Sequence, residues 1–183
     1  MGRVSQAQAR ENRQRVVRAV AELFRERGAQ VSVVDLMKEV GLTHGGFYKH
    51  FDSKEALFEE AMALAFQEAA AQEYRQPAAE GGLSEQAIAA YLSVEHRDAV
   101  AEGCPVAALA TDVARGHGGS TAQVQYSDGV AQLARLLATD EDDDGLSRMC
   151  TMVGALVLAR ATRDTELSGA ILTAARTALN TSG

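Results

Sequence analysis

The chain has 183 residues, of which 46% are hydrophobic and only two are proline, so it can bury a core and its composition favours helices. Two cysteines are too few for a disulfide framework, the longest apolar run (residues 149–159) is too short to cross a bilayer, and residues 1–15 are too polar for a signal peptide. We therefore expect a cytoplasmic protein with no membrane contact, and its net charge of −7 at first sight disfavours nucleic acid.

The distribution of charge changes that first impression. Residues 1–54 carry ten Lys/Arg and six Asp/Glu, whereas residues 55–183 carry eight Lys/Arg and nineteen Asp/Glu. A basic head on an acidic body indicates that only the head meets a polyanion. A chance fluctuation of surface charge is the alternative.

The first helix is predicted from about Gln6 to Arg27. Ser5 with Gln8 fits a capping box before it, and Gly28 is suited to end it. Its apolar residues recur with helical spacing on one face: Val16, Val17, Val20, Leu23 and Phe24. The arginines before it or in its first turns are Arg3, Arg10, Arg13 and Arg15. They form either an arm that reaches phosphates or the minor groove, or a solvated basic tail.

A helix-turn-helix is predicted next. Ser32 with Asp35 forms a second capping box, and Gly41 ends the short helix that follows it. Leu42 then turns back into the core, and the Thr43 hydroxyl can cap a third helix. Two helices joined by a short turn that contains Gly are typical of this motif.

The rest of the chain is also expected to be helical. A long fourth helix runs from about Lys54 to Arg75. Stretches rich in Gly, Pro or Asp separate five further helices, near residues 83–94, 105–115, 120–139, 146–161 and 165–179. The fold class is therefore all-α, with about nine helices.

The two last helices indicate a partner. Residues 149–159 include no charged side chain, and a helix that is apolar all round is buried on all sides. In a chain of this size a second subunit is the expected cover, with the apolar stripe of the helix near 165–179 beside it. The alternative is that residues 149–159 form the central core helix of a monomer.

Two adjacent glycines lie inside the predicted third helix. Gly45 and Gly46 each cost a helix roughly 1 kcal/mol relative to alanine, yet Phe47 and Phe51 have the spacing of one helical face. Exposed glycines remove Cβ groups, which lets a recognition helix lie close to the bases of the DNA major groove. The alternative is a simple loop at the glycines, which the helical spacing of the two phenylalanines disfavours.

The segment GLTHGGFYKHFDSKEAL, residues 41–57, resembles the recognition segment of regulators of the TetR/AcrR family. That family has a Gly-apolar-Ser/Thr turn, a short helix ending in Tyr-x-His-Phe, and a Ser-Lys-Glu start to its fourth helix. The similarity extends back through SVVDLMKEV and covers about residues 8–66. The segments GCPVAALATDVAR and GALVLARAT are also similar to one branch of the family.

The resemblance implies a helix-turn-helix DNA-binding domain, residues 1–53, and a helical ligand-binding and dimerisation domain, residues 54–183. Such a protein is a homodimeric repressor that binds a palindromic operator in double-stranded DNA through helix 43–50. A small-molecule effector releases it, and it is nucleoid-associated when bound to DNA. The dimer is expected to form through the helices near 146–161 and 165–179.

The resemblance also assigns DNA contacts. Base edges would be faced by Thr43, His44, Gly45 and Gly46, and phosphates by Tyr48, His50 and Lys54. Hydroxyl and ammonium groups are ordinary phosphate partners, and the basic side chain of Lys49 on the same helix is expected to join them. His44 is the candidate for direct base readout, because His can donate to purine N7 or O6. For His50 a capping or packing role is the alternative.

The sequence of the body gives little information about the chemical identity of the effector. The candidate pocket residues are Phe66, Tyr91, His96, Cys104, Thr111, Tyr126, Met149 and Met152, each of which is equally suited to the core. Cys104 directly precedes Pro105, which favours the first position of a helix, and the helix dipole there would favour a thiolate. A redox- or electrophile-sensing regulator is therefore an alternative, as is an inert buried cysteine.

No enzyme, cofactor or metal site is expected. Cys104 with His96 is the one candidate catalytic pair, and no orienting acid accompanies it. No Gly-rich phosphate loop or metal-spaced His/Cys cluster occurs, and DEDDDG at 140–145 lacks the alternating ligands of a calcium loop. The remaining alternative is a dimeric interaction protein with a degenerate head, against which Tyr48, His50 and Lys54 argue.

Overall fold

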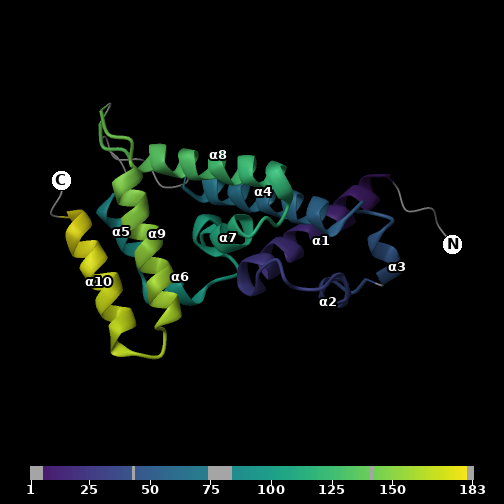
Figure 1. The fold of residues 1–183 in the computed structure, drawn as a ribbon, viewed down its shortest axis with the longest axis horizontal. Coiled ribbons are helices and arrows are strands. Elements are labelled where there is room, and N and C mark those ends of the chain that lie inside the picture. The colour runs from purple at the N-terminus through teal and green to yellow at the C-terminus, as the bar shows by residue number, and fades with distance from the viewer. Residues whose placement is uncertain (1–5, 43, 74–83, 141, 181–183) are drawn as a thin grey trace.

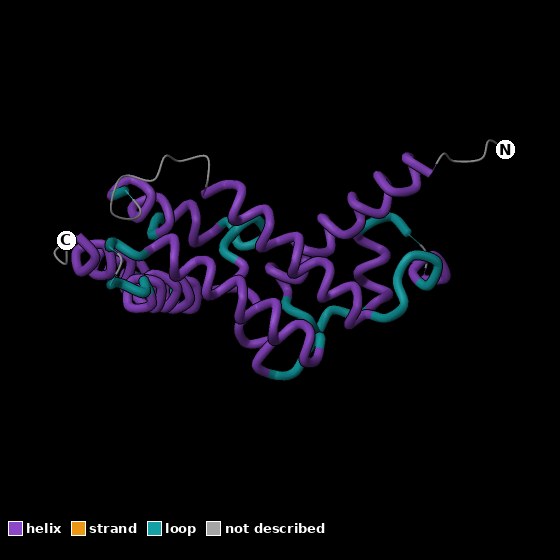
Figure 2. The backbone as a smooth tube through the Cα atoms, turned by 90° about the horizontal axis from the view of Figure 1, so that it is seen from above, coloured by secondary structure: helices purple, strands orange, loops and turns teal. Residues whose placement is uncertain are grey.

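The computed structural model describes residues 6–42, 44–73, 84–140 and 142–180. These residues form ten helices and no strand (Figures 1 and 2). The helices are α1 (Gln6–Arg27), α2 (Val33–Glu39), α3 (His44–Phe47), α4 (Lys54–Glu73), α5 (Glu85–Tyr91), α6 (Val94–Asp98), α7 (Pro105–Ala114), α8 (Gly119–Leu137), α9 (Leu146–Ala161) and α10 (Glu166–Asn180). The prediction of an all-α fold is confirmed.

The head, at one end of the elongated molecule, combines α1, α2, α3 and the start of α4 (Figure 1). Each of these helices contributes a side chain that is at most 1% exposed: Phe24, Leu36, Phe47 and Leu57. Burying a side chain of this size contributes roughly 1.5–3 kcal/mol. That burial offsets the weak helix propensity of α2 and α3, which are too short to be stable alone.

The body contains the other helices, and α4 connects it to the head. α4 packs against α1 in the head and lies alongside α8 in the body (Figure 1). The body has its own core, in which Leu92, Leu137, Met152, Leu156 and Leu172 are each at most 2% exposed. Phe66 of α4 and Tyr126 of α8 pack against both cores, so the head and body are joined by a continuous apolar interior.

α7 lies between head and body, and α9 and α10 pair at the far end (Figure 1). α7 packs against α1, α4, α8 and α9. It therefore contacts both parts of the molecule, whereas the main contacts of α10 are with the body helices α9 and α5. Among the described residues, no helix is both long and apolar enough to span a bilayer.

Two predicted helices differ from the structure. The single helix predicted near 83–94 is wrong beyond Tyr91, because the Ser93 side chain accepts a hydrogen bond from the His96 N–H and starts the separate helix α6. The recognition helix predicted over 43–50 is shorter than expected. After Phe47 the chain continues in tighter turns, with the His50 N–H donating to the Phe47 carbonyl at 2.9 Å.

Candidate functional site

The turn between α2 and α3 fixes the direction in which α3 leaves the head. Gly41 has φ of +69°, which L-residues with a side chain rarely adopt, and it follows Val40, the C-cap residue of α2. The Gly41 N–H donates to the Lys38 carbonyl, and the Leu42 N–H donates to the Met37 carbonyl at 2.8 Å. This bond pair is the Schellman motif, which satisfies the end of α2 while reversing the chain.

Aromatic packing holds α3 on the head. Phe47 is fully buried and Phe51 is 4% exposed, with ring centroids 5.7 Å apart. The ring of Tyr48 contacts the Phe47 ring edge-on at 4.9 Å, although 61% of Tyr48 is exposed. Buried aromatic pairs of this kind stabilise by about 0.5–1.5 kcal/mol beyond their area. The segment is thus anchored to the core of the head by Phe47 and Phe51, while the side chains on its other side remain exposed.

The outer side chains are chemically suited to an anion. Tyr48, Lys49 and His50 are consecutive and all exposed, so they present a hydroxyl, an ammonium and an imidazole on one short stretch of the head. Hydroxyl, ammonium and imidazole N–H groups donate to phosphate oxygens.

Arg13 is engaged inside the head rather than extended from it. Its two Nη groups donate to the Glu60 carboxylate of α4, and its Nε donates to the His50 carbonyl at 3.4 Å. Its guanidinium carbon also lies 4.7 Å from the centre of the Phe51 ring. Arg13 is therefore neither part of an extended basic arm nor part of a solvated tail, the two alternatives that the sequence left open.

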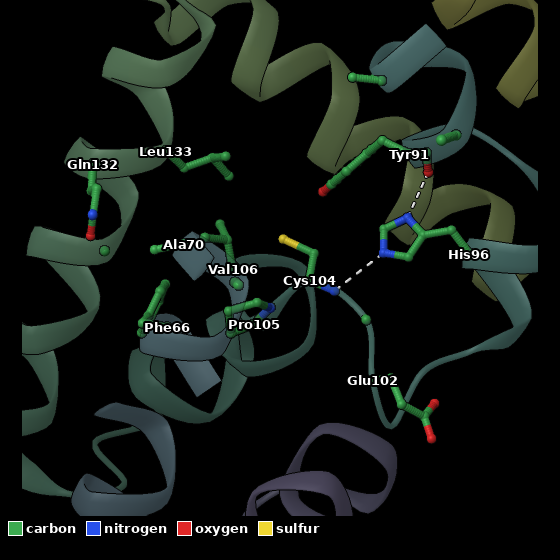
Figure 3. Close-up of a pocket in the computed structure, with 15 residues that line it drawn as sticks. Phe66, Ala70, Tyr91, His96, Glu102, Cys104, Pro105, Val106, Gln132 and Leu133 are labelled. Carbon is green, nitrogen blue, oxygen red and sulfur yellow. Dashed lines mark hydrogen bonds between the residues drawn. The ribbon is translucent and has the colours of Figure 1, made fainter. Parts of the chain in front are cut away.

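The body contains a cavity of about 290 Å³ between α4, α5, α8 and the start of α7 (Figure 3). Small apolar residues form much of its wall, with Phe66, Tyr91 and Leu133 as the large ones. The Cys104 sulfur points into it, while Glu102 at its edge is directed away from the apolar side chains (Figure 3). The cavity can therefore hold a small, mainly apolar molecule.

His96 organises one edge of this cavity. Its Nδ1 lies 2.6 Å from the Tyr91 carbonyl oxygen, which can only accept, so Nδ1 carries the proton. Its Nε2 accepts from the Cys104 N–H at 3.3 Å. Burial lowers the pKa of His96, which keeps the ring neutral. Because both nitrogens are occupied, His96 does not serve as a base for the Cys104 thiol, which weakens the catalytic-pair interpretation.

A charged cleft of about 330 Å³ adjoins the cavity on the side of the head. The two share Ala69, Glu102 and Gly103 in their walls. Arg25 of α1 lines the cleft, is 7% exposed, and donates through Nε to the Ala101 carbonyl. A buried guanidinium of the head thus holds the loop whose next three residues form the wall of the cavity.

Comparison with known proteins identifies a family whose sequence pattern matches the head. Residues 16–61, which include the Schellman turn, α3 and the start of α4, match the sequence model of the family described as "Bacterial regulatory proteins, tetR family". Residues 16–61 thus carry the sequence pattern of the TetR family. This match supports a DNA-binding transcriptional regulator with the head as its DNA-binding part.

Solved structures of TetR-type fold resemble the whole chain. A TetR transcriptional regulator from Chloroflexus aurantiacus matches with a TM-score of 0.71 at 22% identity, over 96% of each chain. A TetR-family regulator from Cytophaga hutchinsonii gives 0.68 at 17%, over 98% of this chain and 97% of that one. The reduced form of E. coli NemR gives 0.69 at 19%, over 92% and 95%. No curated protein matches the chain significantly.

The TetR-family head contains all the residues for which DNA contact was predicted. Thr43 lies outside the described residues, while His44, Gly45 and Gly46 form the backbone of α3. Lys54, at the start of α4, donates from its ammonium to the Ala29 carbonyl. An ammonium has three N–H donors, so this bond leaves capacity for a phosphate.

The predicted effector residues of the body separate into two groups. Phe66, Tyr91, His96 and Cys104 line the cavity. The other four lie elsewhere: Thr111 is exposed, Tyr126 donates to the Val106 carbonyl at 2.7 Å, and Met149 and Met152 are buried in the body core. The sequence reading missed Ala69, Ala70, Ala87, Ala90 and Gln132 of the cavity wall. Alanine gives no chemical signal, so only the packing of α4 against α5 and α8 could have identified them.

Among the described residues, no group of three or more His, Cys, Asp or Glu side chains gathers as a metal site would require. The acidic stretch near 140–145 instead bonds to its own backbone. Asp143 accepts from the Gly145 N–H and from the Thr139 N–H and hydroxyl, which lowers the pKa of this carboxyl.

Proposed function

We propose that this protein is a homodimeric repressor that binds a palindromic operator through residues 43–50 and is released by a small apolar molecule. The observation that carries the proposal is the exposed row of Tyr48, Lys49 and His50 on a segment anchored by buried Phe47 and Phe51. A head built only for stability would gain nothing from exposing an aromatic ring there or from placing two glycines in a helix.

The head supplies phosphate contacts and base contacts from one short segment. Tyr48 and Lys49 would donate to phosphates on either side of the groove and fix the register of the head. The His44 imidazole would read a purine edge, and the glycines would let the backbone approach the bases. Lys54 would add a phosphate contact from α4 while its bond to Ala29 holds it against α1.

Two heads are needed to read a palindrome. Half-sites on one face of DNA are about 34 Å apart, so two copies related by a two-fold axis would each insert one recognition segment. Exposed apolar residues at the far end of the body support this assembly: Val157 and Leu158 of α9 and Leu167 of α10 are 42%, 57% and 56% exposed. Helices α9 and α10 are accordingly the proposed interface.

The effector would be a mainly apolar molecule in the cavity. Its volume of about 290 Å³ is near the lower end of the usual range for ligand sites, about 300–1,000 Å³. Phe66 and Tyr91 offer ring faces, and Gln132 offers one polar contact. Among the described residues, no Lys or Arg side chain lines this cavity, which favours an uncharged molecule over an anion.

α7 and the loop before it provide a route from effector to head. The loop residues Glu102 and Gly103 and the first residues of α7 line the cavity. Arg25 of α1 holds the preceding carbonyl, that of Ala101, and the buried Asp112 of α7 lies against Gly28, where α1 ends. A ligand that displaces this loop would move α1 and change the separation of the two heads. Release requires that the ligand prefer the DNA-incompetent state.

Thiol sensing is a second candidate, favoured by the position of Cys104. Its sulfur points into the cavity and the residue caps the N-terminus of α7 (Figure 3). Modification of this thiol would fill the same cavity that a ligand would occupy. Replacing Cys104 with Ser would abolish a thiol response and retain a response to a reversible ligand.

The proposal is tested by selecting bound molecules from random duplex DNA with the purified full-length protein. Enrichment of an inverted repeat is the expected result. A single half-site motif would contradict the dimeric reading. No enrichment at low salt, from folded protein, would overturn operator binding and favour the degenerate-head alternative.

Variants connect the result to the proposed residues. Tyr48→Ala combined with Lys49→Gln is expected to abolish enrichment while leaving the fold and the assembly unchanged. Arg135→Gln, at an exposed position of α8 in the body, removes one positive charge and is the matched control. Equal losses in both proteins would show that net charge, not the segment, controls binding.

A further inference from the structure

We propose that Arg13 and Glu60 clamp the recognition segment, residues 44–51, in its DNA-binding geometry, and that Arg13 is a positioning residue and not a phosphate contact. The inference rests on the proposed function, because its effect appears as operator affinity. It assigns a role in recognition to two residues on α1 and α4, outside the segment itself.

The segment needs external support. α3 spans only four residues, two of which are glycine, and a helix this short has no stability of its own. The chain from Lys49 to Phe51 continues in turns whose N–H groups bond back to Gly46 and Phe47. Phe47 and Phe51 fix the segment by apolar contact, which has little directional preference. A directional contact is therefore required to fix its orientation.

Arg13 supplies that directional contact from three sides. Its Nη2 donates to the Glu60 Oε2 at 2.7 Å and its Nη1 to the Glu60 Oε1, so the pair is bidentate. Its Nε donates to the backbone carbonyl of His50 at 3.4 Å. Its planar face lies over the Phe51 ring, with 4.7 Å between the guanidinium carbon and the ring centre. One guanidinium thus joins α1, α4 and the end of the recognition segment.

The same geometry argues against a phosphate role for Arg13. The two Nη groups that would bind a phosphate are directed at Glu60, and one face of the guanidinium is covered by the Phe51 ring. The side chains of Arg13 and Glu60 are each 38% exposed, so water weakens the pair and its contribution to global stability is small. The Arg13–Glu60 pair instead raises the fraction of heads in which the recognition segment is correctly oriented. The apparent affinity for DNA scales with that fraction.

The sign of one substitution separates the two roles. Glu60→Gln removes a negative charge from the head. If Arg13 contacted phosphate, this change would free the guanidinium and tighten DNA binding. If the pair is a clamp, the change loosens the segment and weakens DNA binding although the head becomes more positive.

The experiment measures the dissociation constant of the full-length protein for the selected operator over a series of salt concentrations. The variants are Arg13→Gln, Glu60→Gln and their combination. The matched controls are Arg18→Gln, which breaks another exposed ion pair between α1 and α4, that with Glu68, and Glu59→Gln, the neighbouring carboxylate on α4. Circular dichroism establishes that each variant is folded, and Arg13→Lys, which keeps the charge but not the fork, replaces Arg13→Gln if the latter is unfolded.

We expect Arg13→Gln and Glu60→Gln each to weaken binding by about two- to fivefold, the range expected for loss of a partly exposed ion pair that sets the fraction of correctly oriented segments. The combination should be no weaker than the weaker single variant, because one clamp is lost in each case. The salt dependence should keep the wild-type slope. A slope reduced by about 0.9 in Arg13→Gln, or tighter binding by Glu60→Gln, would overturn the inference and show a phosphate contact.

The two levels of failure are distinguishable. If the wild-type protein binds no duplex, the proposed function is wrong. If the wild-type protein binds and both variants bind with wild-type affinity, only the clamp is wrong.

Discussion

At the scale of single residues, His96 shows how one side chain can make the body sensitive to acid. Its ring lies between the Tyr91 carbonyl and the Cys104 N–H, and burial lowers its pKa below the ordinary 6.5 despite the opposite effect of the bond to Tyr91. In the unfolded chain the ring takes up a proton as the pH falls through about 6.5, whereas in the folded chain it resists protonation. The unfolded state then binds more protons, so stability falls with decreasing pH.

We therefore expect the free energy of unfolding to decrease between pH 7.5 and pH 5.5, by less than about 1.4 kcal/mol per pH unit from this residue. Urea titrations at several pH values measure it. His96→Gln should be less stable at pH 7.5 but should lose much of this pH dependence. An unchanged slope in His96→Gln would show that another group carries the effect.

At the scale of elements, Gly129 shows that helix propensity and packing oppose each other on α8. A Cβ added at Gly129 would lie 2.3 Å from the Phe66 ring of α4, too close for any real contact. Gly129→Ala gains roughly 1 kcal/mol of helix propensity, but the rigid ring must move, which costs about 1–3 kcal/mol. We expect a net decrease in thermal stability and a smaller cavity, since Phe66 lines it.

The companion variant is Phe66→Leu, which removes the ring edge. Alone it should destabilise, because Phe66 packs against both cores. Combined with Gly129→Ala, the loss should be smaller than the sum of the single losses, as a double-mutant cycle would reveal. Additive losses would show that the ring and the missing Cβ do not compete for the same space.

Elements were predictable from the sequence where the signal is local. The bounds of α1 and α9 agree with those predicted, because caps, glycines and apolar periodicity act within a few residues. The short extent of α3 and the Arg13–Glu60 pair were not predictable. The pair joins residues 47 positions apart, and its formation depends on how α1 and α4 cross. The alanine wall of the cavity was missed for the same reason.

At the scale of the whole molecule, the far end of the body is the part that a single chain leaves incomplete. The helix predicted to be buried on all sides does bury Met152, Ala155 and Leu156 within the chain. Its opposite side, with Val157 and Leu158, stays exposed in one copy. Exposed apolar residues that are adjacent on one helix are typical of an interface rather than of a monomer surface.

Leu158→Arg tests this interpretation. Leu158 is 57% exposed, so in a single chain the substitution has space for its charge and should change monomer stability by no more than about 0.5 kcal/mol. In the proposed dimer the arginine would be buried without a partner, which is costly, and light scattering should report a monomer with weakened operator binding. The control is Val124→Arg on α8, where a 61% exposed valine lies outside the two helices of the proposed interface. If Leu158→Arg remains dimeric, the two-fold axis lies elsewhere, and the spacing of the two heads must be derived from a different face.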